Sequence, residues 1–191
     1  MSVVSYLVLA IALGISNMLL FCRCAKAASV RLSAGLVICM TVALIHVVFY
    51  WAGTLIGSLL SLQSPVDPGM YSDTNAYIFL GLAVAVLLKQ LVPYLRRNPR
   101  LPVFNLGDTA STLALAAASG IDVMLLGIGV GFADNAPNIH LIIWPLLAFD
   151  FLLGYLGLMF GRQKVHLRHR RWMVIASILI LGVAIAAAVN A

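Results

Sequence analysis

The sequence predicts an all-α integral membrane protein whose six transmembrane helices form two inverted three-helix repeats. Composition is the first reason, because 63% of the 191 residues are hydrophobic and only 9% are charged, whereas a soluble domain has about 25% charged residues. The second reason is a succession of long apolar runs joined by short connections. The third is an internal repeat, since residues 7–20 recur as residues 113–126 with nine of fourteen positions identical.

Windows of about 20 apolar residues place the spans at residues 3–22, 33–60, 75–95, 107–133, 140–160 and 172–189. The first span is too long for a cleavable signal and has no Lys or Arg before it. The second and fourth exceed the thickness of a bilayer, so they are expected to tilt. Before the third span, Pro65, Pro68 and Gly69 predict a loop over residues 63–75. The chain is therefore expected to form one transmembrane domain over residues 1–191, with repeat one at 3–95 and repeat two at 107–189.

The charges of the connections predict the orientation. The first, third and fifth connections hold eleven of the twelve basic residues: Arg23, Lys26, Arg31, Arg96, Arg97, Arg100, Arg162, Lys164, Arg168, Arg170 and Arg171. The second and fourth hold no basic residue, only Asp67, Asp73 and Asp134. By the positive-inside rule the basic connections are cytoplasmic and both termini lie outside a bacterial inner (cell) membrane. Three spans per repeat then invert the second copy relative to the first, as in many secondary transporters.

Polar residues occupy repeat-equivalent positions near the centres of four spans. Ser16, followed by Asn17, corresponds to Asp122 at an offset of 106, and His46 corresponds to Asp150 at an offset of 104. An aspartate at the centre of an apolar span costs about 3 kcal/mol to insert, so it usually marks a pathway or a binding site. Oxygen ligands with an imidazole suit a divalent cation such as manganese, magnesium or zinc. The same groups would also suit a proton relay. These five residues are the candidate metal ligands.

Each of these residues also has a structural interpretation. His46 and Asp150 could form an ion pair, and Asp122 could hydrogen-bond to a neighbouring Ser or Thr. Ser16 and Asn17 could serve as polar packing residues between helices. Lys89, the one Lys or Arg residue inside a span, is expected to extend its ammonium toward the cytoplasmic interface, with a role in substrate binding as the alternative.

Small residues in the second span of each repeat predict close helix packing. Gly53 and Gly57 correspond to Gly157 and Gly161, again at an offset of 104. Glycines four positions apart allow two helices in lipid to approach closely.

The arrangement of these residues resembles the MntP-type manganese efflux pumps, within the LysE-like exporter group. The segment SGIDVMLLGIGVGFA, residues 119–133, is similar to that family's S-x-D-A-M-A-x-G-x-G helix, and YLGLMFGR, residues 155–162, is similar to the end of its fifth helix. The resemblance implies export of manganese from the cytoplasm, with Asp122 as the functional aspartate. In the first repeat the chain departs from the family pattern. Ser16 or Asn17 stands where the family has an aspartate, and His46 where it has a glutamate; Asp150 stands where family members can carry a neutral residue.

Three functions are compatible with the sequence. The first is export of a divalent cation, manganese in the first place, by proton-coupled alternating access. The second is export of a small organic solute such as an amino acid by the same fold, and the third is a membrane scaffold. Two carboxylates and an imidazole favour a cation, whereas mixed charges at the midplane would favour a zwitterion.

Other classes of function have little support in the sequence. The chain has no Walker loop, Ser–His–Asp arrangement or zinc-protease motif, so we expect neither an enzyme nor a resident cofactor. The net charge of +6 lies in the connections between spans, which indicates topology and not a nucleic-acid-binding face. The lipid bilayer is the expected environment of the chain. The sequence does not determine the oligomeric state, and a homodimer is one possibility.

Overall fold

The computed structural model describes residues 2–27, 31–62, 68–95, 103–133, 139–165 and 169–189. Over these residues the chain forms six α-helices and no strand. The helices are α1 (Val3–Ala27), α2 (Leu32–Leu62), α3 (Pro68–Leu95), α4 (Thr109–Ala133), α5 (Ile139–Arg162) and α6 (His169–Val189). All six are long and apolar enough to cross a membrane, which confirms the predicted all-α, six-span fold.

The start of α3 differs from the prediction. The helix begins at Pro68, within the segment that was expected to be a loop, and it includes Asp73. Proline is well tolerated in the first turn of a helix, because the N–H that it lacks would have no partner inside the helix. Pro68 therefore starts the helix instead of preventing it.

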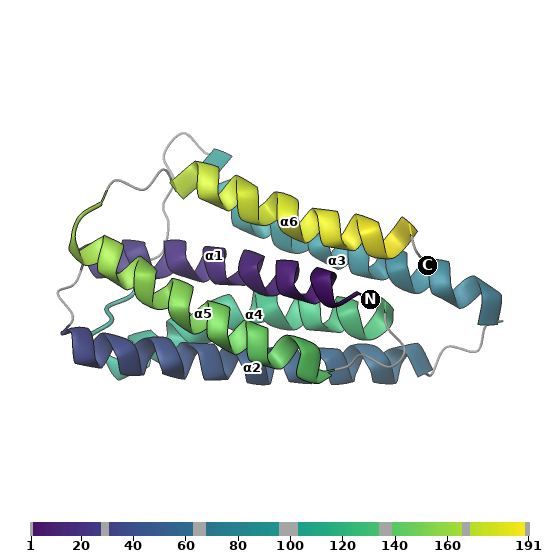
Figure 1. Cartoon of the computed structure of the whole chain (residues 1–191), viewed down its shortest axis with the longest axis horizontal. Coiled ribbons are helices and arrows are strands. Elements are labelled where there is room, and N and C mark those ends of the chain that lie inside the picture. Colours follow the sequence, from purple (N-terminus) through teal and green to yellow (C-terminus); the bar gives the residue numbers. More distant parts are fainter. Residues whose placement is uncertain are drawn as a thin grey trace.

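Several charges that predict the orientation lie outside the described residues, namely Asp67, Arg96, Arg97, Arg100, Asp134 and Arg168. Consecutive helices cross the bundle in opposite directions, so both termini lie at the same end (Figure 1). Which end faces the cytoplasm remains a prediction from the charge pattern.

The helices pack in a pattern that is the same for both halves of the chain. The most extensive contacts pair α1 with α5 and α2 with α4. Smaller contacts join α3 to α4, α6 to α1, α3 to α6 and α2 to α5. Exchanging α1 with α4, α2 with α5 and α3 with α6 leaves this set of neighbours unchanged. The two halves therefore interleave, and each first helix packs on the second helix of the other half.

Glycines bring the backbones of the principal pairs into direct contact, as the sequence predicts. A Cβ atom on Gly53 would lie 2.3 Å from the backbone oxygen of Met124, and one on Gly157 would lie 2.1 Å from that of Met18. Met18 and Met124 are themselves 106 residues apart, so the two contacts are equivalent. One turn further the contact recurs at 2.2 and 2.5 Å, for Gly57 with Ile128 and for Gly161 with Cys22. A side chain at any of these positions would force the helices apart.

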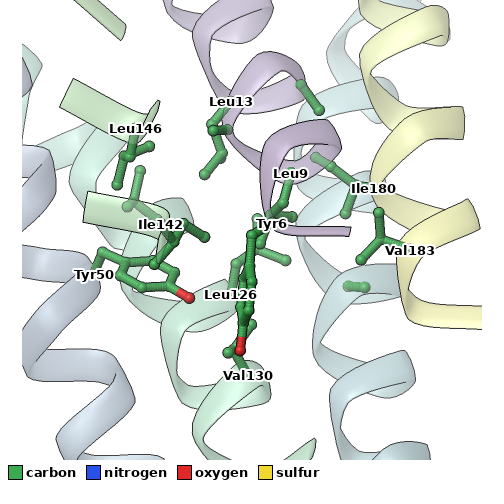
Figure 2. Close-up of a cluster of buried hydrophobic side chains, with 14 of the residues drawn as sticks. Tyr6, Leu9, Leu13, Tyr50, Leu126, Val130, Ile142, Leu146, Ile180 and Val183 are labelled. Carbon is green, nitrogen blue, oxygen red and sulfur yellow. The ribbon is translucent and has the colours of Figure 1, made fainter. Parts of the chain in front are cut away.

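The half of the bundle that contains the termini is filled by an apolar cluster (Figure 2). Its members come from all six helices, and include Tyr6, Leu9, Tyr50, Phe79, Val130, Ile142 and Val183. All of these side chains are buried. Dense packing of this kind leaves little space for water or ions at this end of the bundle.

Candidate functional site

A cavity of about 340 Å³ lies in the other half of the bundle. It extends from Ser16 in the middle of α1 to Arg23 near the end of that helix, and to Phe104, which precedes α4. Its wall is mostly apolar, but eight polar side chains line it: Ser16, Asn17, Arg23, His46, Lys89, Gln90, Ser119 and Asp122. The cavity adjoins the apolar cluster, since Leu13 and Val123 belong to both, and it extends from there toward the end opposite the termini.

Asp122 lies in the middle of α4, and only 13% of its side chain is exposed. The ammonium of Lys89 on α3 donates a hydrogen bond to its Oδ1 and forms an ion pair with it. A second, longer hydrogen bond of 3.3 Å joins the Lys89 Nζ to the backbone oxygen of Ala118. The expectation that Lys89 extends to the membrane interface is therefore wrong. A carboxylate in a low-dielectric interior attracts a nearby cation more strongly than a carboxylate in water does.

Gln90 connects Asp122 to its repeat-equivalent residue, Ser16. The Gln90 Nε2 donates to the Asp122 Oδ2 at 3.4 Å, while the Ser16 hydroxyl donates to the Gln90 Oε1 at 3.3 Å. The equivalent positions of the two repeats thus belong to one hydrogen-bond network across the cavity. The oxygen atoms of this network suit a hard cation, and its oxygen and amide groups can all bind water.

The Asn17 amide, in the cavity wall, is buried without hydrogen-bond partners among the described residues. It is 3% exposed, and within the described part of the chain neither its Oδ1 nor its Nδ2 has a hydrogen-bond partner. A buried amide without partners costs about 1–3 kcal/mol. Such a cost is commonly offset by water or by a ligand, which makes the Asn17 amide a candidate ligand-binding group.

His46 and Asp150 form the ion pair that the sequence left as an alternative. The His46 Nδ1 lies 2.6 Å from the Asp150 Oδ2, and the two side chains are 2% and 0% exposed. The other ring nitrogen, Nε2, lies 2.8 Å from the hydroxyl of Ser119 on α4. His46 and Ser119 line the cavity, whereas Asp150 lies behind His46 and does not.

Ser119 allows this network to exist in two protonation states. Its hydroxyl lies 2.8 Å from the backbone oxygen of Leu115 as well as next to His46. When the imidazole is neutral with its hydrogen on Nδ1, Nε2 accepts the Ser119 hydrogen. When His46 carries both hydrogens, Nε2–H donates to Ser119, whose own hydrogen turns to Leu115. Every ring nitrogen is satisfied in both states, as a proton-carrying histidine requires.

Four of the five predicted ligands line the cavity, Ser16, Asn17, His46 and Asp122, and the fifth, Asp150, reaches it only through His46. Among the described residues, no group of three or more His, Cys, Asp or Glu side chains is placed to hold a metal ion. A metal bound in the cavity would therefore depend on Asp122 together with neutral oxygen ligands and water.

Sequence reasoning did not identify Gln90 and Ser119 as members of the site, and it placed Lys89 elsewhere. One signal was available for Lys89, because it is the single basic residue of the chain inside a predicted span. Gln90 and Ser119 carry no comparable signal, since neutral polar residues are common in membrane helices.

These features define a multi-pass helical membrane protein with a charged cavity that begins at mid-span. No family model matches the chain, and comparison with the curated proteins and the solved structures gave no match either. The resemblance to manganese efflux pumps therefore rests on the motifs in residues 119–133 and 155–162.

Proposed function

We propose that the protein is a secondary transporter that exports a divalent metal cation, manganese in the first place, through this cavity. The observation that carries the proposal is Asp122, a carboxylate at mid-span whose side chain lines a cavity with unpaired polar atoms. Charged residues at such a depth in a membrane protein usually lie on a substrate pathway.

The donor groups suit a hard cation that keeps part of its water. Asp122 supplies the negative charge, and the side-chain oxygens of Asn17, Ser16 and Gln90 are neutral donors in the same wall. Manganese and magnesium favour such oxygen ligands. A volume of about 340 Å³ leaves room for several waters at about 30 Å³ each.

Alternating access is supported by the contrast between the two ends of the bundle. The apolar cluster closes the end with the termini, and the cavity reaches toward the other end. If the basic connections are cytoplasmic, the cavity faces the cytoplasm, where an exporter takes up its substrate. Interleaved halves with equivalent contacts could exchange their conformations and open the opposite end, as inverted-repeat transporters do.

The coupling ion in this proposal is the proton. The pair His46–Asp150 can gain or lose a proton without losing hydrogen bonds, and Ser119 connects it to the cavity. The chain has no nucleotide-binding sequence that could supply another source of energy. Protons entering from outside would then drive the cation out.

The test is metal transport by the whole chain. Purified protein in liposomes that are acidic inside should take up manganese in exchange for protons that leave. An exporter-deficient bacterium that expresses the protein should survive added manganese and have a lower cell content of the metal. A panel with magnesium, zinc, cobalt and nickel gives the selectivity. Absence of any metal flux, with the protein correctly inserted, would exclude the proposal.

A second candidate function has its own supporting observation. Lys89 and Asp122, of opposite charge, line a cavity whose wall is otherwise largely apolar. Small-molecule sites commonly have this composition, and an amino acid could place its carboxylate on Lys89 and its amine on Asp122. Efflux of amino acids from the same liposomes, with no metal flux, would favour this function.

A further inference from the structure

Lys89 occupies one of the two carboxylate oxygens to which an incoming cation could bind. Its ammonium donates to the Asp122 Oδ1, while within the described residues the other oxygen, Oδ2, accepts only the long hydrogen bond from Gln90. A metal ion that binds through Oδ1, or through both oxygens, must take the place of this ammonium, and one that binds through Oδ2 alone would still lie next to it. Nothing in the proposed function by itself requires a lysine at this position.

The Lys89 ammonium is placed so that it can leave. The side chain is 48% exposed, against 13% for Asp122, and it has a second acceptor in the backbone oxygen of Ala118, one turn away from Asp122 on α4. The four-carbon stem of a lysine can swing without any movement of the backbone. Asp122, by contrast, belongs to a helix that is held to α2 by glycine contacts.

We propose that Lys89 is a tethered competing cation that occupies Asp122 whenever the site holds no substrate. The inference rests on the proposed function, because it assumes that Asp122 binds the exported metal. Binding of the metal displaces the ammonium toward Ala118, and return of the ammonium helps to release the metal. Between transport events the carboxylate is never left without a counter-ion in the low-dielectric interior, where this would be costly.

The same arrangement selects for divalent over monovalent cations. At equal distance a divalent ion attracts a carboxylate twice as strongly as an ammonium does. Sodium and potassium carry the same charge as the ammonium and also lack the advantage of a covalent tether. They should therefore fail to displace Lys89, whereas manganese should succeed.

The experiment measures manganese binding to the purified full-length chain by equilibrium dialysis. Lys89→Met removes the charge and keeps an unbranched side chain, so the variant should bind manganese about tenfold more tightly and release it more slowly. Sodium at millimolar concentration should begin to compete in this variant but not in the wild type. Lys89→Arg keeps the competing charge and should retain wild-type affinity. Lys164→Met, at an exposed position just after α5, is the matched control and should change nothing.

Thermal unfolding gives a second readout, in case Lys89→Met is less stable. Without a counter-ion for Asp122 its Tm should be lower in the absence of metal, and manganese should raise that Tm more than it raises the wild-type Tm. If Asp122→Asn abolishes manganese binding while Lys89→Met leaves it unchanged or weaker, the competing role is wrong and the proposed function stands. If neither the wild type nor any variant binds manganese, both the competing role of Lys89 and the proposed function are wrong.

Discussion

Two ion pairs inside the described spans differ in almost every physical respect. His46 and Asp150 join α2 to α5, are nearly inaccessible, and continue into Ser119. Lys89 and Asp122 join α3 to α4, face a cavity, and include a side chain that is half exposed. The first pair is almost completely buried, and the second includes a side chain that is accessible from outside.

The helices that carry the two pairs also differ in how extensively they are packed. The helices of the buried pair, α2 and α5, are each held to a helix of the other half by backbone contacts at glycines. In α3 and α6, by contrast, Cβ atoms on Gly81 and Gly182 would have no neighbour within 4 Å. The comparison teaches that Asp150, on a helix with extensive contacts, has a buried partner, whereas Asp122 pairs with a residue of α3, a helix with less extensive contacts, and faces the cavity.

The largest effect is expected from breaking the buried pair. Asp150→Ala leaves His46 without its partner in a buried site, which should lower the free energy of unfolding by about 4 kcal/mol. Asp122→Ala should cost about 1 kcal/mol or less, because the half-exposed Lys89 can be solvated again. Thermal unfolding in detergent compares the two variants. Replacing both buried partners, as His46→Leu with Asp150→Leu, should restore most of the stability. Equal losses for Asp150→Ala and Asp122→Ala would contradict the difference between the two pairs.

Transport should respond strongly to a change at Asp122 that has little effect on stability. Asp122→Asn keeps the size of the side chain but removes the charge that binds a cation, so manganese export should fall about 100-fold, equivalent to about 2.7 kcal/mol. Membrane abundance should stay near the wild-type level, because a neutral side chain costs less to insert. Asp108→Asn, at the exposed start of α4, is the control. Loss of the protein instead of loss of flux would assign Asp122 to structure.

The glycine contacts allow the packing half of the comparison to be tested directly. Gly57→Ala and Gly161→Ala each place a methyl group where the backbone of another helix lies, and should each cost about 2 kcal/mol. Gly81→Ala and Gly182→Ala meet open space and should be neutral or stabilise by up to about 1 kcal/mol. Unfolding of the four variants side by side measures the difference. A similar cost at all four positions would mean that the backbone contacts at Gly57 and Gly161 do not determine the loss of stability.

The smallest effect concerns a carboxylate outside the bundle. Asp108 precedes α4 and accepts a hydrogen bond of 2.9 Å from the backbone N–H of Ser111, which lowers the pKa of the carboxyl below its ordinary value. Because the folded pKa is the lower one, the carboxylate stabilises the fold at pH values above the ordinary aspartate range. This contribution disappears as the pH falls through the folded pKa. Asp108→Asn keeps an acceptor at the helix start, so Tm measured from pH 6 to pH 3 should show a slightly flatter acid slope than in the wild type. An unchanged slope would mean that the hydrogen bond to Ser111 does not stabilise the charged form.

Much of the fold follows from the sequence because the bilayer restricts what a chain can do. Long apolar runs must be helices, since no other segment satisfies its backbone hydrogen bonds in lipid. The error at Pro68 concerns a helix start, where a proline can be read either as a break or as a first turn.

For the site, the sequence determined which charged residues would be unusual, and the tertiary structure decided which of them meet. Composition and the internal repeat identified Ser16, His46, Asp122 and Asp150 without any coordinates, because an apolar span makes each polar group conspicuous. The partners depended on helix rotation and on the neighbours of each helix. The packing of α3 on α4 brings Lys89 to Asp122, and the crossing of α2 with α5 brings His46 to Asp150. A periodic apolar sequence specifies that a helix crosses the membrane, but the direction in which a polar side chain points is set by close contacts between helices, such as those at the glycines.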